Sequence, residues 1–330
     1  MATNNVLDRL TSMLPVEDLE LFELYQQAKR TYWTEDEVDI SNDVVQWNTK
    51  LTNDQKTFLS HVLGFFVQSD QLVNINLEER FVKDITTIPN KYAKYARLFY
   101  NFQTAMEDIH TLSYETMLNE FISDPVENEY FKNAISRIPA ISKKAKWAAK
   151  YIDDYDSTFA TRLIAFAILE GIFFSGSFCS IFWIESKNLL RGLAQYNKFI
   201  SRDENLHYQF ALTLFKKLRD DHNYDFEIDN EQIIEMVTGA VIIENEFINE
   251  SIPCDMIGMN SNLMTKYIHY IADQLFIDID LPPFYNEENP FPFMVALGLV
   301  DKSNFFEARE TVYQKPAQGV IEYDSDNSDF

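Results

Sequence analysis

The chain has 330 residues with 52 acidic and 28 basic side chains, so its formal net charge is −24. That charge argues against binding to DNA, RNA or anionic lipid, because phosphate contacts need clusters of lysine and arginine. Apolar residues make up 46% of the chain, glycines number only 8, and no proline occurs between Pro139 and Pro253. Few helix breakers over so long a span predict a folded, all-α protein.

The two cysteines, Cys179 and Cys254, lie far apart and form no CxxC pair. An absent disulfide framework is typical of a reducing compartment. The first ten residues lack a basic start followed by an apolar core, which a secretory signal would need. We therefore expect a cytoplasmic protein.

The first half of the sequence is expected to hold several helices. Residues 1–14 are predicted to be a flexible N-terminus, and Pro15 opens an acidic amphipathic segment. Thr52–Gln55 has the pattern of a capping box before a long helix that runs through Asp70 and Leu77. A second long helix is predicted over 90–122, and Pro125 and Pro139 flank two shorter ones.

Longer helices are predicted in the second half. Two of them cover 153–185 and 187–219, with Gly192 near their junction, and others cover 229–250 and 260–278. A short helix is expected near 303–313, before a polar acidic tail over 314–330. No linker divides the sequence, so we expect one helical domain over 15–313 with flexible ends.

The segment from Leu163 to Ile184 is long and apolar enough to span a bilayer, and Glu170 is its one charged residue. A membrane span would place this carboxylate near its middle, at a cost of about 2.5–3.5 kcal/mol. A helix buried at the centre of a bundle explains the same pattern if Glu170 is protonated, paired or bound to metal. We favour the buried helix and expect no association with membranes.

Two histidines follow a glutamate by three residues, in Glu107-x-x-His110 and Glu204-x-x-His207. Positions i and i+3 share one face of a helix, so each pair can hold a metal from one side. One such pair alone is most often a surface contact between a glutamate and a histidine. Two pairs on separate long helices favour a metal site.

A lone carboxylate in an apolar helix precedes each pair. Asp70 lies 37 residues before Glu107, and Glu170 lies 34 residues before Glu204. The near-equal spacings suggest two similar helix pairs that contribute matched half-sites. This is the ligand set of ferritin-like di-iron carboxylate bundles, in which two helices give a carboxylate each and two give ExxH.

Four carboxylates and two imidazoles suit iron or manganese better than copper or structural zinc. Three further histidines lack a matching partner and are interpreted as surface or packing residues (His61, His222 and His269). Gly171 and Gly176 have the spacing of a phosphate-binding loop, but Ser177 stands where such a loop needs lysine. No cysteine lies near a candidate histidine, which gives a thiol nucleophile little support.

Tyr114 lies four residues after His110 on the same helical face. Phe174 and Phe178 continue the face of Glu170, and Ile200 lies one turn before Glu204. An apolar stripe at this spacing is most often simply core. Beside a redox-active metal, the same stripe would also shield a reactive species from water.

Long blocks of the sequence resemble the radical-generating small subunit of class I ribonucleotide reductase, closest to its eukaryotic and viral branch. The resemblance covers about residues 30 to 315. It is carried by YWTEDEVDIS at 32–41, SHVLGFFVQSD at 60–70, AMEDIHTLSY at 105–114, EGIFFSGSF at 170–178, ISRDENLH at 200–207, IGMNSNLM at 257–264, ENPFPFM at 288–294 and NFFEARETVYQK at 304–315.

The resemblance implies two iron ions per chain, with manganese or a mixed Mn/Fe pair left open. It assigns one ion to Asp70, Glu107 and His110, and the other to Glu170, Glu204 and His207. It further implies a tyrosyl radical on Tyr114 in a pocket of Phe174, Phe178 and Ile200. Asp203 would orient His110, and Trp33 would pass electrons to the metal through Asp203.

The implied reaction is the reduction of O₂ by two ferrous ions, after which the oxidised cluster removes an electron and a proton from Tyr114. The radical would pass to a larger subunit that converts ribonucleoside diphosphates to deoxyribonucleotides. The resemblance also implies a homodimer, docking to the large subunit through the tail 314–330, and a radical relay through Tyr313.

Three residues depart from the family's pattern near the ligands, namely Val67, Gln68 and Asn205. Two alternatives stay open beside this interpretation. A di-iron oxygenase or oxidase on the same bundle would need a substrate channel and no Tyr114. A non-catalytic helical interaction protein would bind no metal.

Overall fold

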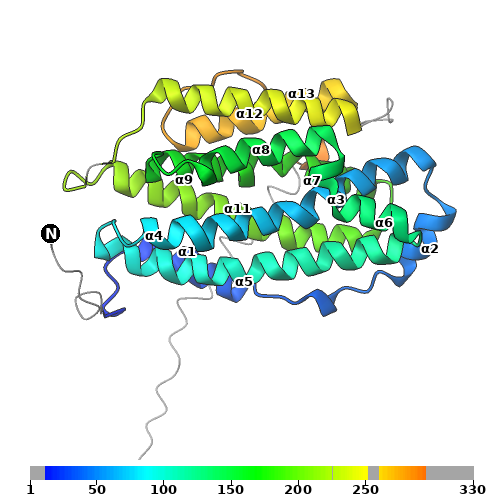
Figure 1. Cartoon of the computed structure of the whole chain (residues 1–330), viewed down its shortest axis with the longest axis horizontal. Helices are drawn as coiled ribbons and strands as arrows, with labels where there is room; N and C mark the ends of the chain where they lie inside the picture. The colour runs from blue at the N-terminus through cyan, green and yellow to red at the C-terminus, as the bar shows by residue number, and fades with distance from the viewer. Residues whose placement is uncertain (1–11, 225, 252–259, 295–330) are drawn as a thin grey trace, which may run out of the picture. The chain divides into compact units, whose positions relative to one another are not determined.

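The computed structural model describes residues 12–224, 226–251 and 260–294 (Figure 1). The protein divides into two compact units, residues 1–290 and 291–330. The second unit is described only over 291–294, where the Met294 amide donates to the carbonyl of Phe291 over 3.0 Å. The expected helix near 303–313, the tail and most of the N-terminal segment lie outside the described residues.

Four long helical segments form the centre of the first unit. They are α3 (Asn53–Asn76), α5 (Asn90–Phe121), α11 (Arg191–Arg219) and a composite of α9 (Phe159–Ile168), the π-helical segment η4 (Leu169–Phe173) and α10 (Ser175–Ser186). Helix α3 packs along α5, and α11 packs against α5 and all three parts of the composite segment. The described residues of this unit contain no strand, so the all-α prediction is confirmed.

Shorter helices cover the centre. α1 (Leu19–Arg30) lies on α5 and α11, whereas α12 (Asn230–Ser251) and α13 (Ser261–Asp278) pack on each other at the top of Figure 1. Helix α8 (Pro139–Asp153) lies between α12 and α3. The remaining elements are η2 (Glu35–Glu37), α2 (Ser41–Thr49), η3 (Leu77–Phe81), α4 (Val82–Asp84), α6 (Pro125–Lys132) and α7 (Ala134–Arg137).

Local signals explain several helix ends. The capping box of Thr52 and Gln55 starts α3, since each of the two side chains accepts a hydrogen bond from the other residue's amide, over 3.2 and 3.0 Å. Pro125 and Pro139 each occupy the first position of a helix, where a missing N–H costs little. The short helices α6 and α7 lie between them, as predicted.

The prediction of one helix over 153–185 is wrong at its start. Helix α8 ends at Asp153, and α9 begins at Phe159 after Thr158 caps it by accepting the Thr161 amide over 3.2 Å. Five residues, 154–158, therefore separate the two helices, and four of them are polar.

The junction before α11 lies near Gly192, as expected, but α11 begins at Arg191 rather than at residue 187. The backbone turns at Asn188 and Leu190, both at positive φ, rather than at Gly192. Gly192 lies in the first turn of α11, where a Cβ atom would come within 2.9 Å of the Asp39 carbonyl oxygen. Asp43 on α2 accepts the Leu193 amide over 2.7 Å, which helps to cap the start of α11. The glycine permits α2 to approach that closely.

The apolar stretch Phe159–Ser186 forms the α9–η4–α10 segment, with mean hydropathy 1.8 over its most apolar window. It is the one described segment long and apolar enough to cross a membrane, and 94% of that window is buried inside the protein itself. This burial is what the central-helix interpretation predicts. Glu170 lies in η4, and π-helical turns often occur at functional sites.

Candidate metal centre

The six residues of the two predicted half-sites come together at the centre of the bundle. Helix α3 brings Asp70, α5 brings Glu107 and His110, η4 brings Glu170, and α11 brings Glu204 and His207. All six are buried. Their potential ligand atoms form two groups, each within 4.8 Å, and Glu107 belongs to both groups.

The two glutamates of the ExxH pairs lie between the two imidazoles. His110 Nδ1 is 3.2 Å from Glu107 Oε2 and 3.0 Å from Glu204 Oε1. His207 Nδ1 is 2.7 Å from Glu204 Oε2 and 3.0 Å from Glu107 Oε1. Each carboxylate thus reaches both histidines, so Glu107 and Glu204 have the position of groups shared by two ions. Atoms about 3 Å apart can also share one ion at bonds of about 2.0 to 2.2 Å.

Three of the four oxygens of the outer carboxylates lack a hydrogen-bond donor among the described residues. Neither oxygen of Asp70 nor Oε2 of Glu170 has a hydrogen-bond partner among the described residues, although both residues are buried. Burial raises the pKa of Asp70, and the charge of Glu107 raises it further. Burial also raises the pKa of Glu170, assisted by Glu204. Orphaned carboxylate oxygens in an apolar core fit a site for cations.

The imidazoles respond to the same negative charge. Burial opposes protonation of His207, yet Glu107 and Glu204 beside it raise its pKa to about 9. Burial likewise opposes protonation of His110, and Glu204 with Asp203 raises its pKa well above the usual value. In the metal-free protein these protons balance the carboxylates. Metal ions would replace that positive charge, because a ligating imidazole is neutral.

A series of hydrogen bonds leads from His110 through Asp203 to the buried Trp33. Asp203 Oδ2 lies 3.3 Å from His110 Nε2 and accepts the indole N–H of Trp33 over 2.7 Å. The Trp33 ring also stacks on the His110 ring, with centroids 5.9 Å apart and planes 17° apart. Asp203 thereby holds Nε2 in the donor role and leaves Nδ1 to face the cluster.

Tyr114 lies in an aromatic pocket beside the cluster. Its ring stacks on Phe66 at a centroid distance of 4.6 Å and an angle of 4°. Phe66 in turn contacts Phe178 and Phe174 at 4.9 and 5.5 Å. The Tyr114 hydroxyl is buried without a hydrogen-bond partner among the described residues. Burial, with a smaller contribution from Asp70, raises the pKa of Tyr114 well above its usual value, so the phenol keeps its proton.

Sequence reasoning missed two residues of this site. Gln103 donates to Glu107 Oε1 over 3.0 Å and to Glu170 Oε1 over 3.4 Å, which ties the two half-sites together. Phe66 is the ring that stacks on Tyr114. Each lies four residues before a predicted ligand, Glu107 or Asp70, so helical periodicity could have indicated both.

The other candidates are placed as follows. Ile200 is buried on α11, one turn before Glu204. Val67 is buried, Gln68 accepts the Ile135 amide over 2.7 Å, and Asn205 is exposed. These three departures thus support packing of neighbouring helices or face solvent. His61, His222 and His269, which no glutamate precedes by three residues, lie outside both ligand groups. Tyr313 lies outside the described residues.

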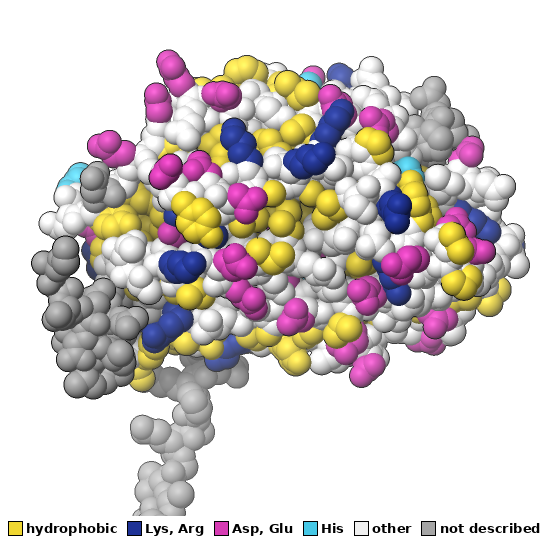
Figure 2. Space-filling view, in the orientation of Figure 1, with side chains coloured by type: hydrophobic (Ala, Val, Ile, Leu, Met, Phe, Trp, Pro, Cys, Tyr) yellow, Lys and Arg dark blue, Asp and Glu magenta, His cyan; other side chains and the backbone are white. Residues whose placement is uncertain are grey.

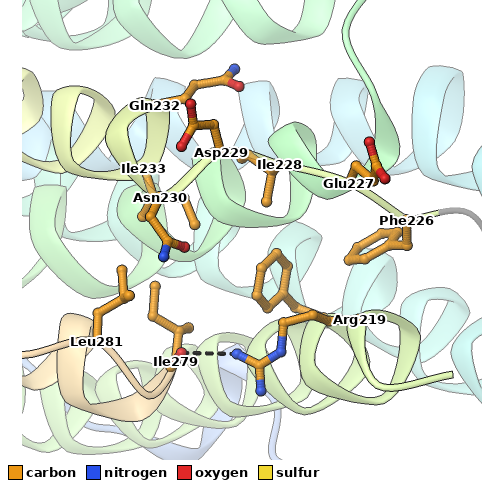
Figure 3. Close-up of a pocket in the computed structure, with 11 residues that line it drawn as sticks. Arg219, Phe226, Glu227, Ile228, Asp229, Asn230, Gln232, Ile233, Ile279 and Leu281 are labelled. Carbon is orange, nitrogen blue, oxygen red and sulfur yellow. Dashed lines mark hydrogen bonds between the residues drawn. The ribbon is translucent and has the colours of Figure 1, made fainter. Parts of the chain in front are cut away.

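A cavity of about 460 Å³ lies at the end of α11, away from these groups (Figure 3). The start of α12 and residues after α13 complete its lining, in which Arg219 donates to the carbonyl of Ile279 over 2.9 Å. None of the residues that line it belongs to either ligand group.

The four central helical segments and their buried carboxylate–histidine groups define a helical bundle of the ferritin-like class. The family model "Ribonucleotide reductase, small chain" matches residues 10–290. The protein therefore belongs to the small-chain family of ribonucleotide reductase, an oxidoreductase family, as the resemblance indicated.

Individual relatives agree with this assignment. The ribonucleoside-diphosphate reductase small subunit of Dictyostelium discoideum is 44% identical over 308 residues, which cover 93% of this protein and 87% of the relative. Subunit M2 of the human enzyme is 42% identical over 316 residues, covering 96% and 77%. Among solved structures, the ribonucleotide reductase Rnr4 homodimer of Saccharomyces cerevisiae is similar, with a TM-score of 0.75, 32% identity and coverage of 92% and 90%.

Proposed function

We propose that this small subunit binds two iron ions, with manganese or a mixed pair as alternatives, and stores a radical on Tyr114. The observation that carries the proposal is Tyr114 in a closed aromatic pocket beside a buried, donor-poor carboxylate cluster. Asp70, Glu107 and His110 would hold one ion, and Glu170, Glu204 and His207 the other. When bound, the metal pair would supply the chemistry with O₂ that oxidises the tyrosine.

The residues around the ions have separate tasks. Glu107 and Glu204 each reach both histidines, and Glu107, which belongs to both ligand groups, would also contact the second ion. Asp203 keeps the Nε2 proton on His110, and Trp33 supports that carboxylate with its own N–H. Since Trp33 stacks on His110, this path is the one we assign to electron delivery.

The pocket of Tyr114 protects the radical. The phenol is protonated in the resting protein and has no hydrogen-bond partner among the described residues, so it loses its proton only when oxidised. Phe66 stacks on the ring, and Phe174 and Phe178 pack against Phe66, so the phenol lies beside an apolar cluster that excludes water.

Metal analysis with electron paramagnetic resonance tests this proposal. After anaerobic loading with ferrous iron, we expect about two ions per chain, and exposure to O₂ should produce a tyrosyl radical signal. A radical-free di-iron protein that oxidises a small substrate would instead favour the oxygenase alternative. A protein that binds no metal would favour the interaction module and reject the proposal.

We also propose that the radical serves a large subunit, where ribonucleoside diphosphates are reduced. The support is family membership together with the acidic tail, whose last eleven residues contain four acids and no base. Deleting 324–330 should weaken binding to the large subunit and leave metal loading and the Tyr114 radical intact. Tyr313→Phe should keep both docking and the radical but abolish nucleotide reduction. Unchanged affinity after truncation, or full turnover by Tyr313→Phe, would reject the respective role.

A homodimer is the expected assembly, since the similar yeast structure is described as one. In the present protein Asn74 on α3 bonds Asp108 on α5 over 3.0 Å. Ile75, which follows Asn74, and Leu112, one turn after Asp108, are 45% and 47% exposed. Acidic side chains are spread over the face drawn in Figure 2, with lysines and arginines scattered among them.

We assign the α3–α5 surface around Ile75 and Leu112 to this dimer. Leu112→Glu should shift the protein to a monomer in light scattering. Ile242→Glu, at an apolar residue of α12 that is 61% exposed, serves as the control and should leave the mass unchanged. A dimer that persists in Leu112→Glu would place the interface elsewhere.

A further inference from the structure

A lysine and a glutamate are buried together outside the metal centre, between α8 and α12. Lys144 Nζ lies 2.8 Å from Glu244 Oε2, and both side chains are fully buried. The ammonium also lies 3.5 Å from the ring centroid of Phe65 and 4.1 Å from that of Phe247. Burial lowers the pKa of Lys144 to about 8 and raises that of Glu244 to about 7, and the partner's charge opposes each change.

Such a pair is a poor source of stability. Removing two charges from water offsets most of their attraction, and apolar residues of similar size often stabilise a protein as well or better. Its presence beside a functional centre therefore indicates a task other than stability.

The lysine is directed at the segment that carries Glu170. Lys144 Nζ donates to the carbonyl oxygen of Phe173 over 2.7 Å, and Ser175 Oγ donates to that of Ile172 over 2.9 Å. Ile172 and Phe173 are the last two residues of the π segment η4. A π-helical turn departs from the α-helical hydrogen-bond pattern, so donors from outside can select its shape.

The glutamate lies against the first turn of α10, which follows η4. A Cβ atom on Gly176 would lie 2.7 Å from Glu244 Oε1, so a larger residue there would displace the carboxylate from this position. Phe174, between the lysine contact and the glycine, is the pocket residue that contacts Phe65 and Phe66 at 5.7 and 5.5 Å. The pair thus meets the backbone on both sides of Phe174.

We propose that Lys144 and Glu244 are positioning residues that hold η4 in its π-helical form and so set the reach of Glu170 into the second half-site. The part that concerns metal rests on the proposed function. The part that concerns the backbone does not, because the contacts exist in the metal-free protein. Two measurements separate the parts.

The informative variant is Lys144→Met/Glu244→Leu. Lys144→Met alone would leave a buried carboxylate unpaired and endanger folding. The double variant removes both charges, and we expect its Tm to lie within about 3 °C of the native value or above it. The matched control is Lys143→Met/Glu246→Leu, which removes a half-exposed ion pair from the same two helices.

The first measurement is hydrogen–deuterium exchange of the metal-free proteins. Exchange in peptides that cover 166–180 should rise at least about tenfold in the double variant and stay native in the control. Glu244→Gln keeps the lysine and its bond to Phe173, so it should restore most of the protection. Native exchange in the double variant would overturn the proposal, whatever the metal results.

The second measurement is a titration with Mn²⁺ followed by electron paramagnetic resonance. Native protein and the control should bind two equivalents, and the double variant should bind the second about 10–100-fold more weakly. If exchange rises while both equivalents bind normally, the link to Glu170 is refuted. If the native protein itself binds no Mn²⁺ or Fe²⁺, the proposed metal function fails, and the exchange result still decides the role of the pair.

Discussion

Trp33 donates its indole N–H to Asp203 over 2.7 Å, although the two residues lie 170 positions apart in the sequence. The accepting oxygen, Oδ2, is the one that lies 3.3 Å from His110 Nε2. One carboxylate oxygen therefore contacts both the buried tryptophan and the histidine of the cluster. The Arg202 guanidinium lies 3.3 Å from the other oxygen, Oδ1, so its positive charge offsets part of the negative charge of Asp203.

Asp203→Asn should weaken the half-site of His110. The neutral amide accepts weaker hydrogen bonds and no longer favours one orientation and tautomer of the imidazole. We expect metal affinity at one of two equivalents to fall about 10–100-fold. Titration with Mn²⁺ measures this loss.

Asp108→Asn is the matched control for that substitution. Asp108 is an exposed acid on the same helix as His110, and its described partner is Asn74. Two native-like equivalents in the control and one weakened equivalent in Asp203→Asn are expected. Equal affinities in both variants would remove Asp203 from the orienting role.

Tyr114→Phe should assemble the metal centre and show no stable radical. Because the hydroxyl has no described hydrogen-bond partner, its loss should change the free energy of unfolding by less than about 1 kcal/mol. Tyr100→Phe is a close control, since Tyr100 is also buried with an unpartnered hydroxyl among the described residues. Paramagnetic resonance after oxygen exposure should show a native signal in Tyr100→Phe only. A native signal in Tyr114→Phe would assign the radical to another tyrosine.

His207→Ala should lose one of two metal equivalents. The substitution also leaves Glu107 and Glu204 with one cation fewer, so the metal-free variant should lose about 3–5 kcal/mol of stability while most helicity remains. His269→Ala removes a ring that stacks on Tyr285 at 4.1 Å, outside the cluster, and should load two ions. Metal stoichiometry and circular dichroism decide the outcome, and full loading of His207→Ala would contradict the ligand assignment.

The ligand residues could be predicted because helical periodicity is a local property. Glu107 and His110 share a face by their spacing alone, and the same holds for Glu204 and His207. The contact between the pairs, in which each glutamate reaches both histidines, depends on how α5 packs on α11. Spacing within one helix says nothing about its neighbour, so periodicity could not predict this crossed contact.

Other features depend on tertiary structure and left no local trace. The break between Asp153 and Phe159 did leave one, because the polar residues Asp154, Asp156, Ser157 and Thr158 interrupt the apolar pattern and Thr158 caps the next helix. The π-helical form of η4 looks like ordinary helix in sequence, because its side chains are as apolar as their neighbours. In the sequence Lys144 is one of several lysines in an amphipathic helix. Only the packing of α12 on α8 shows that Glu244 faces it.

The last prediction concerns how the Lys144–Glu244 pair responds to pH. The folded pKa of Glu244, about 7, lies above its ordinary value of 4.5, so the folded state holds more protons between these values. Stability from this group is therefore present below about 4.5 and is lost as pH rises through about 7. The folded pKa of Lys144, about 8, lies below its ordinary 10.5, so its contribution recovers as pH rises from 8 toward 10.5.

The two effects together predict a minimum between about pH 7 and 8, where both groups are charged. The free energy of unfolding of native protein minus that of Lys144→Met/Glu244→Leu should be lowest there. It should rise toward pH 5 and toward pH 10 by on the order of 3 kcal/mol on each side. Taking this difference cancels the titration of the metal cluster, which both proteins share. Urea denaturation with a chelator present, at steps between pH 5 and 10, measures the curve. A flat curve would show that folding leaves the pKa values of both groups at their ordinary values, and an inverted curve would show that the folded protein stabilises the charged pair. Either result would contradict the burial effect on these two groups.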